Sequence, residues 1–143
     1  MSLHPVLSGA EWNDASVLLR GFALVGIPIG ISLGAALGLI ARKEEGWGGY
    51  SSFPRRAARL GHVAAVALPL LAGFYALALT AWPHDAALAQ TGSGLWIVGS
   101  AALVLTLFAG AWKRGIANWL PLPATTVLAG GAVLALSILR GGA

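Results

Sequence analysis

The chain has 143 residues, of which 57% are hydrophobic and only 10% are charged, and its formal net charge is +4. A soluble domain carries about 25% charged residues, so this composition excludes an ordinary soluble protein. The absence of cysteine excludes disulfides, thiolate metal ligands and covalent c-type haem attachment. The net positive charge does not indicate nucleic-acid binding, because the basic residues are concentrated in loops, where they determine membrane topology.

Four apolar stretches occupy most of the chain, and each is long enough to cross a hydrocarbon core of about 30 Å. They are Val17–Ala41, His62–Trp82, Leu95–Trp112 and Leu122–Leu139. We therefore predict an all-α fold: a single transmembrane domain, residues 1–143, with four helices in an antiparallel bundle. Tryptophan favours the membrane–water boundary, and all six tryptophans are expected there. Trp12, Trp82 and Trp96 would mark one side, and Trp47, Trp112 and Trp119 the other.

The distribution of basic residues predicts the orientation. The connection after the first stretch contains Arg42, Lys43, Arg55, Arg56 and Arg59, and the one after the third contains Lys113 and Arg114. The connection between the second and third stretches has no Lys or Arg, and its Gly92–Gly94 segment is interpreted as a flexible turn. Because positively charged loops stay in the cytoplasm, we expect both termini to be periplasmic in a bacterial inner membrane. Arg20 and Arg140 are exceptions near the outer boundary.

No Lys or Arg precedes the first apolar stretch, so it is expected to be a retained helix and not a cleaved signal. Within the cytoplasmic connection, residues 42–61, Ser52 is expected to cap a helix that has Pro54 in its first turn. This helix would carry Arg55, Arg56 and Arg59 and continue into the second span. The three arginines are either a solvated topology signal or a docking surface for a partner or an anionic lipid.

Glycines recur at every fourth position of the first span: Gly26, Gly30, Gly34 and Gly38. This spacing places them on one helix face, where the absence of side chains allows another backbone to approach closely. The sequence leaves three alternatives for what packs against this glycine stripe. They are a helix of the same chain, a helix of another subunit, or a flat cofactor such as haem, a chlorophyll-type pigment or a carotenoid.

The four spans contain few groups capable of chemistry. No Asp, Glu or Lys falls in the membrane interior, where proton pumps and ion-coupled carriers usually need an ionisable group. His62 and His84 are 22 positions apart, roughly 33 Å along a helix, so they cannot share one iron. His62 is the best candidate for a single axial ligand, although an ordinary interfacial role is open. Glu11, Asp14 and Asp85 are interpreted as a polar rim, with no metal site predicted.

The chain has no H-E-x-x-H sequence, nucleophile elbow or phosphate-binding loop, and we expect no enzymatic activity and no soluble substrate. The sequence favours a non-catalytic accessory subunit of a larger membrane complex, by analogy a respiratory or photosynthetic electron-transfer assembly. Its partners would be other membrane subunits and lipids. The alternatives are a haem- or pigment-binding subunit that uses His62, and a small transporter or channel.

Overall fold

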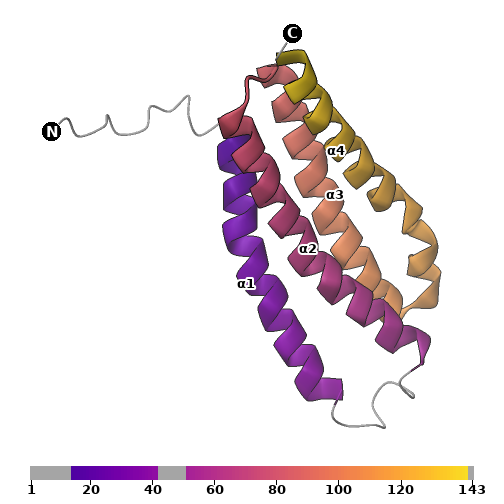
Figure 1. Ribbon diagram of the computed structural model, residues 1–143. Coiled ribbons are helices and arrows are strands. Elements are labelled where there is room, and N and C mark those ends of the chain that lie inside the picture. Colours follow the sequence, from indigo (N-terminus) through magenta and orange to yellow (C-terminus); the bar gives the residue numbers. More distant parts are fainter. Residues whose placement is uncertain (1–13, 42–50, 142–143) are drawn as a thin grey trace, which may run out of the picture.

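The structure, a computed structural model, describes residues 14–41 and 51–141 (Figure 1). This part of the chain forms four α-helices and one 3-10 helix, without strands. The elements are α1 (Ala15–Ala41), α2 (Phe53–Ala81), α3 (Ala86–Trp112), η2 (Arg114–Trp119) and α4 (Pro121–Gly141). The four membrane-length helical segments are apolar enough to span a bilayer. The predicted all-helical fold with four spans is therefore confirmed.

The helices follow one another across the bundle in chain order. Helix α1 packs on α2, α2 on α3, and α3 on α4, while α1 makes a smaller contact with α3. Figure 1 shows α1 and α4 at opposite edges of this arrangement. Short connections such as residues 82–85 leave consecutive helices antiparallel, as expected for adjacent spans.

The beginnings of α2 and α3 are fixed by side-chain caps. The Ser52 hydroxyl accepts a hydrogen bond from the backbone N–H of Arg55 at 3.5 Å, and Pro54 lies in the first turn of α2. This confirms the predicted cap and the helical basic stretch. The carboxylate of Asp85 accepts a bond from the backbone N–H of Leu88 at 3.0 Å and begins α3. Both caps satisfy a backbone donor that the helix itself cannot pair.

Two predictions about α3 are wrong. The segment Gly92–Gly94 is not a turn but lies inside the helix, which begins at Ala86. Trp96 therefore does not lie at the membrane boundary; it is only 5% exposed, in the core. The reason is packing: a Cβ atom at Gly92 would lie 2.9 Å from the backbone nitrogen of Leu134. Glycine at position 92 lets α3 approach α4 closely. The stabilisation from this contact outweighs the low helix propensity of glycine.

Small side chains fill much of the centre, and large apolar side chains cover the outside. Ala72, Ala76 and Ala89 are fully buried beside Leu19 and Leu134. By contrast, the outward-facing leucines are largely exposed, at 76% for Leu24, 68% for Leu105 and 74% for Leu139. An apolar exterior around a core of small residues is the pattern expected of helices that associate in lipid.

Candidate functional site

The glycine stripe of α1 faces α2. A Cβ atom at Gly26 would lie 2.5 Å from Cγ of Pro69, and one at Gly30 would lie 2.5 Å from the carbonyl oxygen of Ala65. Gly38 is different, because a Cβ atom there would meet no other described segment within 4 Å. Helix α2 of the same chain therefore packs against three of the four stripe glycines.

The close contact at Gly30 involves a carbonyl group that a proline in α2 leaves without a helical partner. Pro69 has no N–H group, so the carbonyl oxygen of Ala65, four residues earlier, loses its usual helical partner. This oxygen lies against the backbone of Gly30. The close approach shields the carbonyl from lipid and allows only weak C–H···O contacts in return.

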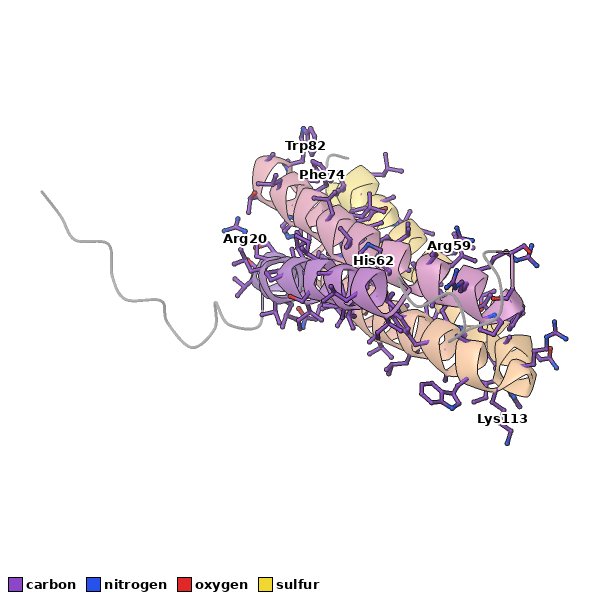
Figure 2. The ribbon with its side chains drawn as sticks, turned by 90° about the horizontal axis from the view of Figure 1, so that it is seen from below. Arg20, Arg59, His62, Phe74, Trp82 and Lys113 are labelled. Atoms are coloured by element: carbon purple, nitrogen blue, oxygen red, sulfur yellow. The ribbon has the colours of Figure 1, made fainter. Side chains whose placement is uncertain are left out.

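His62 lies in the same contact between α1 and α2, next to the position of Gly30 (Figure 2). Its ring takes the space that a side chain at Gly34 would need, with Nε2 only 2.6 Å from the position of a Cβ atom there. Its Nδ1 lies 3.1 Å from the carbonyl oxygen of Gly30. A carbonyl oxygen only accepts, so this hydrogen bond places the proton on Nδ1 and, in the neutral ring, leaves the lone pair on Nε2.

A second polar contact lies in the core, around Trp96. Its indole N–H donates to the carbonyl oxygen of Leu68 at 3.3 Å. The ring meets the edge of Tyr75 at 5.1 Å between centroids, with an interplanar angle of 66°. Gly131 of α4 provides the room, since a Cβ atom there would lie 3.0 Å from the indole ring. Trp96 thus joins α2, α3 and α4 through one side chain.

Sequence reasoning missed this role of Trp96. The signal that could have shown it is the pair Gly130 and Gly131, because Gly131 faces the indole ring and Gly130 faces the backbone of Trp96. Gly130 lies against the backbone of Trp96: a Cβ atom at Gly130 would lie 2.6 Å from the backbone nitrogen of Trp96. An indole inside a bundle needs both space and an acceptor, and the core supplies the two together.

The basic end of the bundle contains a partly open apolar pocket and, next to it, a shallow surface depression. The first, of about 280 Å³, is bounded mostly by apolar side chains. Its lining residues are Phe53, Arg56, Ala57, Leu60, Thr106, Leu107, Gly110, Ala117 and Leu120. The second, of about 360 Å³, shares Phe53 and Ala117 with the first and adds Arg114, Gly115 and Asn118. No feature of the sequence pattern predicted the pocket or the depression, which depend on how η2 folds back under α3.

The predicted basic residues Arg55, Arg56 and Arg59 lie in the first turns of α2. Figure 2 shows Arg59 and Lys113 at one end of the bundle, and Arg20 and Trp82 at the other. The guanidinium of Arg114 stacks over the ring of Phe53 at 5.1 Å, a cation–π contact that links η2 to α2. Arg42 and Lys43 lie outside the described residues.

At the opposite end, the predicted polar rim is only partly described. Asp14 and Asp85 accept bonds from the backbone N–H groups of Ser16 and Leu88, so both act as helix caps. His84 contacts the carbonyl oxygen of Trp82 at 3.2 Å. Glu11, His4 and Trp12 lie outside the described residues, as does Trp47. Within residues 14–41 and 51–141, no three side chains from His, Cys, Asp and Glu form a group able to hold a metal.

Comparison with protein-family models, with curated proteins and with solved structures found no match to this chain. Its function must therefore be inferred from its residues and their packing. What the fold itself defines is a bundle of four helices apolar enough to span a membrane, consistent with a multi-pass membrane protein.

Proposed function

We propose that this protein is a non-catalytic accessory subunit of a larger bacterial membrane complex and that α1 is its contact with a neighbouring subunit. The location that we propose is the inner membrane, with both termini periplasmic, on the basis of the positive charges around η2 and the start of α2. An electron-transfer assembly, respiratory or photosynthetic, is the complex that we expect by analogy with other small helical subunits.

The observation that supports this proposal is the outward face of α1. This helix lies at an edge of the bundle, and its stripe glycines face α2. The opposite face is exposed and combines the small residues Gly21, Pro28, Ser32, Ala35 and Ala36 with the larger Val25 and Leu39. Exposed larger side chains flank it, among them Leu24 and Ile31. Close contact between small residues is a main source of helix association in lipid, so this second face suits another transmembrane helix.

The polar group on that face is already satisfied. The Ser32 hydroxyl donates to the carbonyl oxygen of Pro28 at 2.8 Å. A helix could therefore pack over it without leaving a donor unpaired, which would be costly in a membrane. This separates a packing role from a transport role, in which a free polar group would face the substrate.

The test is purification of the tagged protein from its native host with mild detergent, followed by identification of the polypeptides that accompany it. We expect a stoichiometric set of membrane subunits. Ser32→Leu together with Ala36→Leu should release them, whereas Ala132→Leu on the exposed face of α4 should not. Recovery of the chain alone contradicts the proposal and favours a self-contained transporter or channel, which flux assays in proteoliposomes would then examine.

A second candidate function, binding of haem or another pigment through His62, is supported by one contact. The hydrogen bond from Nδ1 to Gly30 fixes the ring and leaves the lone pair on Nε2, which is how ligating histidines are commonly held. Because Nε2 lies against Gly34, an iron could reach it only if α1 moved away from α2. The absorption spectrum of the purified complex tests this candidate. A full pigment content in the His62→Ala protein contradicts it.

A further inference from the structure

The apolar pocket beside Phe53, at the basic end of the bundle, exists because small residues line one side of a tight turn. Gly110 of α3 packs on Ala117 of η2, where a Cβ atom at Gly110 would lie 3.3 Å from that of Ala117. Ala57 lies on the α2 side. These side chains are too short to fill the space between Phe53 and Leu107. The result is an apolar compartment of about 280 Å³, close to the lower limit of roughly 300 Å³ for small-molecule sites.

Cationic groups lie beside this compartment. Arg56 forms part of its lining, and Arg114 lines the adjoining depression of about 360 Å³ together with Asn118. The shared walls, Phe53 and Ala117, make the pocket and the depression neighbours. Phe53 also holds the Arg114 guanidinium through its ring face. An apolar space therefore adjoins two arginines, Arg56 and Arg114, whose planar guanidinium groups can form strong paired hydrogen bonds with phosphate.

The described charged residues around the site are all cationic. Among the described residues the only carboxylate side chains are Asp14 and Asp85, and both cap helices at the opposite end of the bundle. Glu44 and Glu45 lie outside the described residues. Exposed Lys113 adds a further cation beside η2. A ligand with a negative headgroup complements this end electrostatically.

The position of the site relative to the membrane narrows the choice of ligand. Trp112, just before η2, and Trp119, the last residue of η2, are 90% and 66% exposed, and such exposed indoles favour the headgroup level of a bilayer. In a bilayer positioned by these indoles, the apolar pocket would lie where acyl chains begin, and the arginines would lie at the level of the lipid phosphates. A free phosphate would contact the arginines but would leave the apolar compartment unfilled.

From this juxtaposition we propose that the cavity between the start of α2, the end of α3 and η2 binds an anionic phospholipid. Part of one acyl chain occupies the compartment beside Phe53 and Ala117. The phosphate is held by the guanidinium groups of Arg56 and Arg114. The site does not depend on the accessory-subunit proposal, because no residue of α1 lines it.

Native mass spectrometry of the purified full-length protein, titrated with phosphatidylglycerol, tests the proposal. Phosphatidylcholine with the same acyl chains is the matched lipid. We expect one phosphatidylglycerol to bind more tightly than phosphatidylcholine. The double substitution Arg56→Gln and Arg114→Gln should weaken this binding roughly thirtyfold. Loss of one arginine near an anionic lipid weakens binding roughly fivefold, and the two effects multiply.

Arg20→Gln together with Arg140→Gln is the control, because it removes the same charge at the opposite end and should leave the affinity almost unchanged. Equal affinity for the two lipids, or an equal loss in the control, overturns the proposal. If the double variant at the site does not fold, each single substitution provides the same comparison, with an expected loss of roughly fivefold.

Ala117→Leu tests the acyl-chain part, since the longer side chain would fill the compartment. We expect it to weaken phosphatidylglycerol binding while leaving Arg56 and Arg114 in place. Inorganic phosphate is the second probe, and it should not displace the lipid at millimolar concentration. Unchanged lipid binding by Ala117→Leu, or displacement by phosphate, would show a surface anion site and refute a lipid site.

Discussion

The imidazole ring of His62 on α2 occupies the notch left by Gly34 on α1. In the same place, Nδ1 of His62 bonds to the carbonyl oxygen of Gly30 at 3.1 Å. A glycine stripe and a histidine that are separate features of the sequence therefore form one contact. This contact is one of several that hold the edge helix α1 against α2.

Replacing Gly34 by alanine should destabilise the protein, because the new Cβ atom would lie 2.6 Å from Nε2 of His62. Overpacking of this kind costs about 1–3 kcal/mol of unfolding free energy. Gly38→Ala is the matched control, since no atom of another described segment lies within 4 Å of its Cβ position. Unfolding in bilayers by steric trapping measures both. Equal effects of the two substitutions would contradict a specific contact between Gly34 and His62.

The two sides of this contact should also be energetically coupled. His62→Ala removes the hydrogen bond to Gly30, which we expect to cost about 0.6–1.7 kcal/mol in a membrane protein. In the double variant with Gly34→Ala the small side chain at position 62 leaves room for the new methyl group. The summed cost should therefore be sub-additive by about 0.5–3 kcal/mol. Strict additivity in the double-mutant cycle would show that the two residues act independently.

The main features of the fold could be predicted from the sequence because they depend on local pattern. Long apolar stretches predict four spans, and Ser52 followed by Pro54 predicts the beginning of α2. The start of α3 could not be predicted in this way. Glycine and serine at 92–94 are poor helix formers in isolation, and only their close contact with α4 accounts for a helix there.

The candidate site, too, could be predicted from the sequence only where it depends on local pattern. The four-residue spacing of glycines indicates a face for close packing, but spacing alone does not say which helix covers it. The structure places Pro69, Ala65 and His62 opposite three of the glycines. The cavity beside Phe53 depends on contact between α2 and η2, which are far apart in the sequence, and no periodic pattern encodes such a space.

Trp96 should stabilise the core more than any boundary tryptophan does. Trp96→Phe removes the indole donor and leaves the carbonyl oxygen of Leu68 without this bond, at an expected cost of about 1 kcal/mol in addition to lost packing. Trp112→Phe, at a position that is 90% exposed, should change the unfolding free energy by less than about 0.5 kcal/mol. Thermal unfolding in detergent compares the two variants. A larger effect at Trp112 would refute the central role of Trp96.

The cap of α3 should depend on a side-chain oxygen at position 85. Asp85→Ala removes the acceptor for the N–H of Leu88 and should cost about 0.5–2 kcal/mol of unfolding free energy. Asp85→Asn retains an acceptor oxygen and should keep most of the stability, so it is the conservative control. Chemical denaturation in mixed micelles, followed by far-UV circular dichroism, reports the difference. If the alanine and asparagine variants are equally destabilised, the charge and not the hydrogen bond matters.

The orientation of the bundle can be established with two labels, because the fold already fixes which connections share an end. The α2–α3 connection lies at the end opposite to η2. The chain has no cysteine, so Ala87→Cys and Asn118→Cys, both at exposed positions, each introduce a single thiol. If Lys113 and Arg114 hold η2 in the cytoplasm, a membrane-impermeant maleimide should label position 87 in intact spheroplasts and position 118 only after lysis. The reverse pattern would invert the whole bundle, because all four spans are connected in alternation. It would also place Arg56 and Arg114 at the outer leaflet, and any lipid bound beside Phe53 would then come from that leaflet.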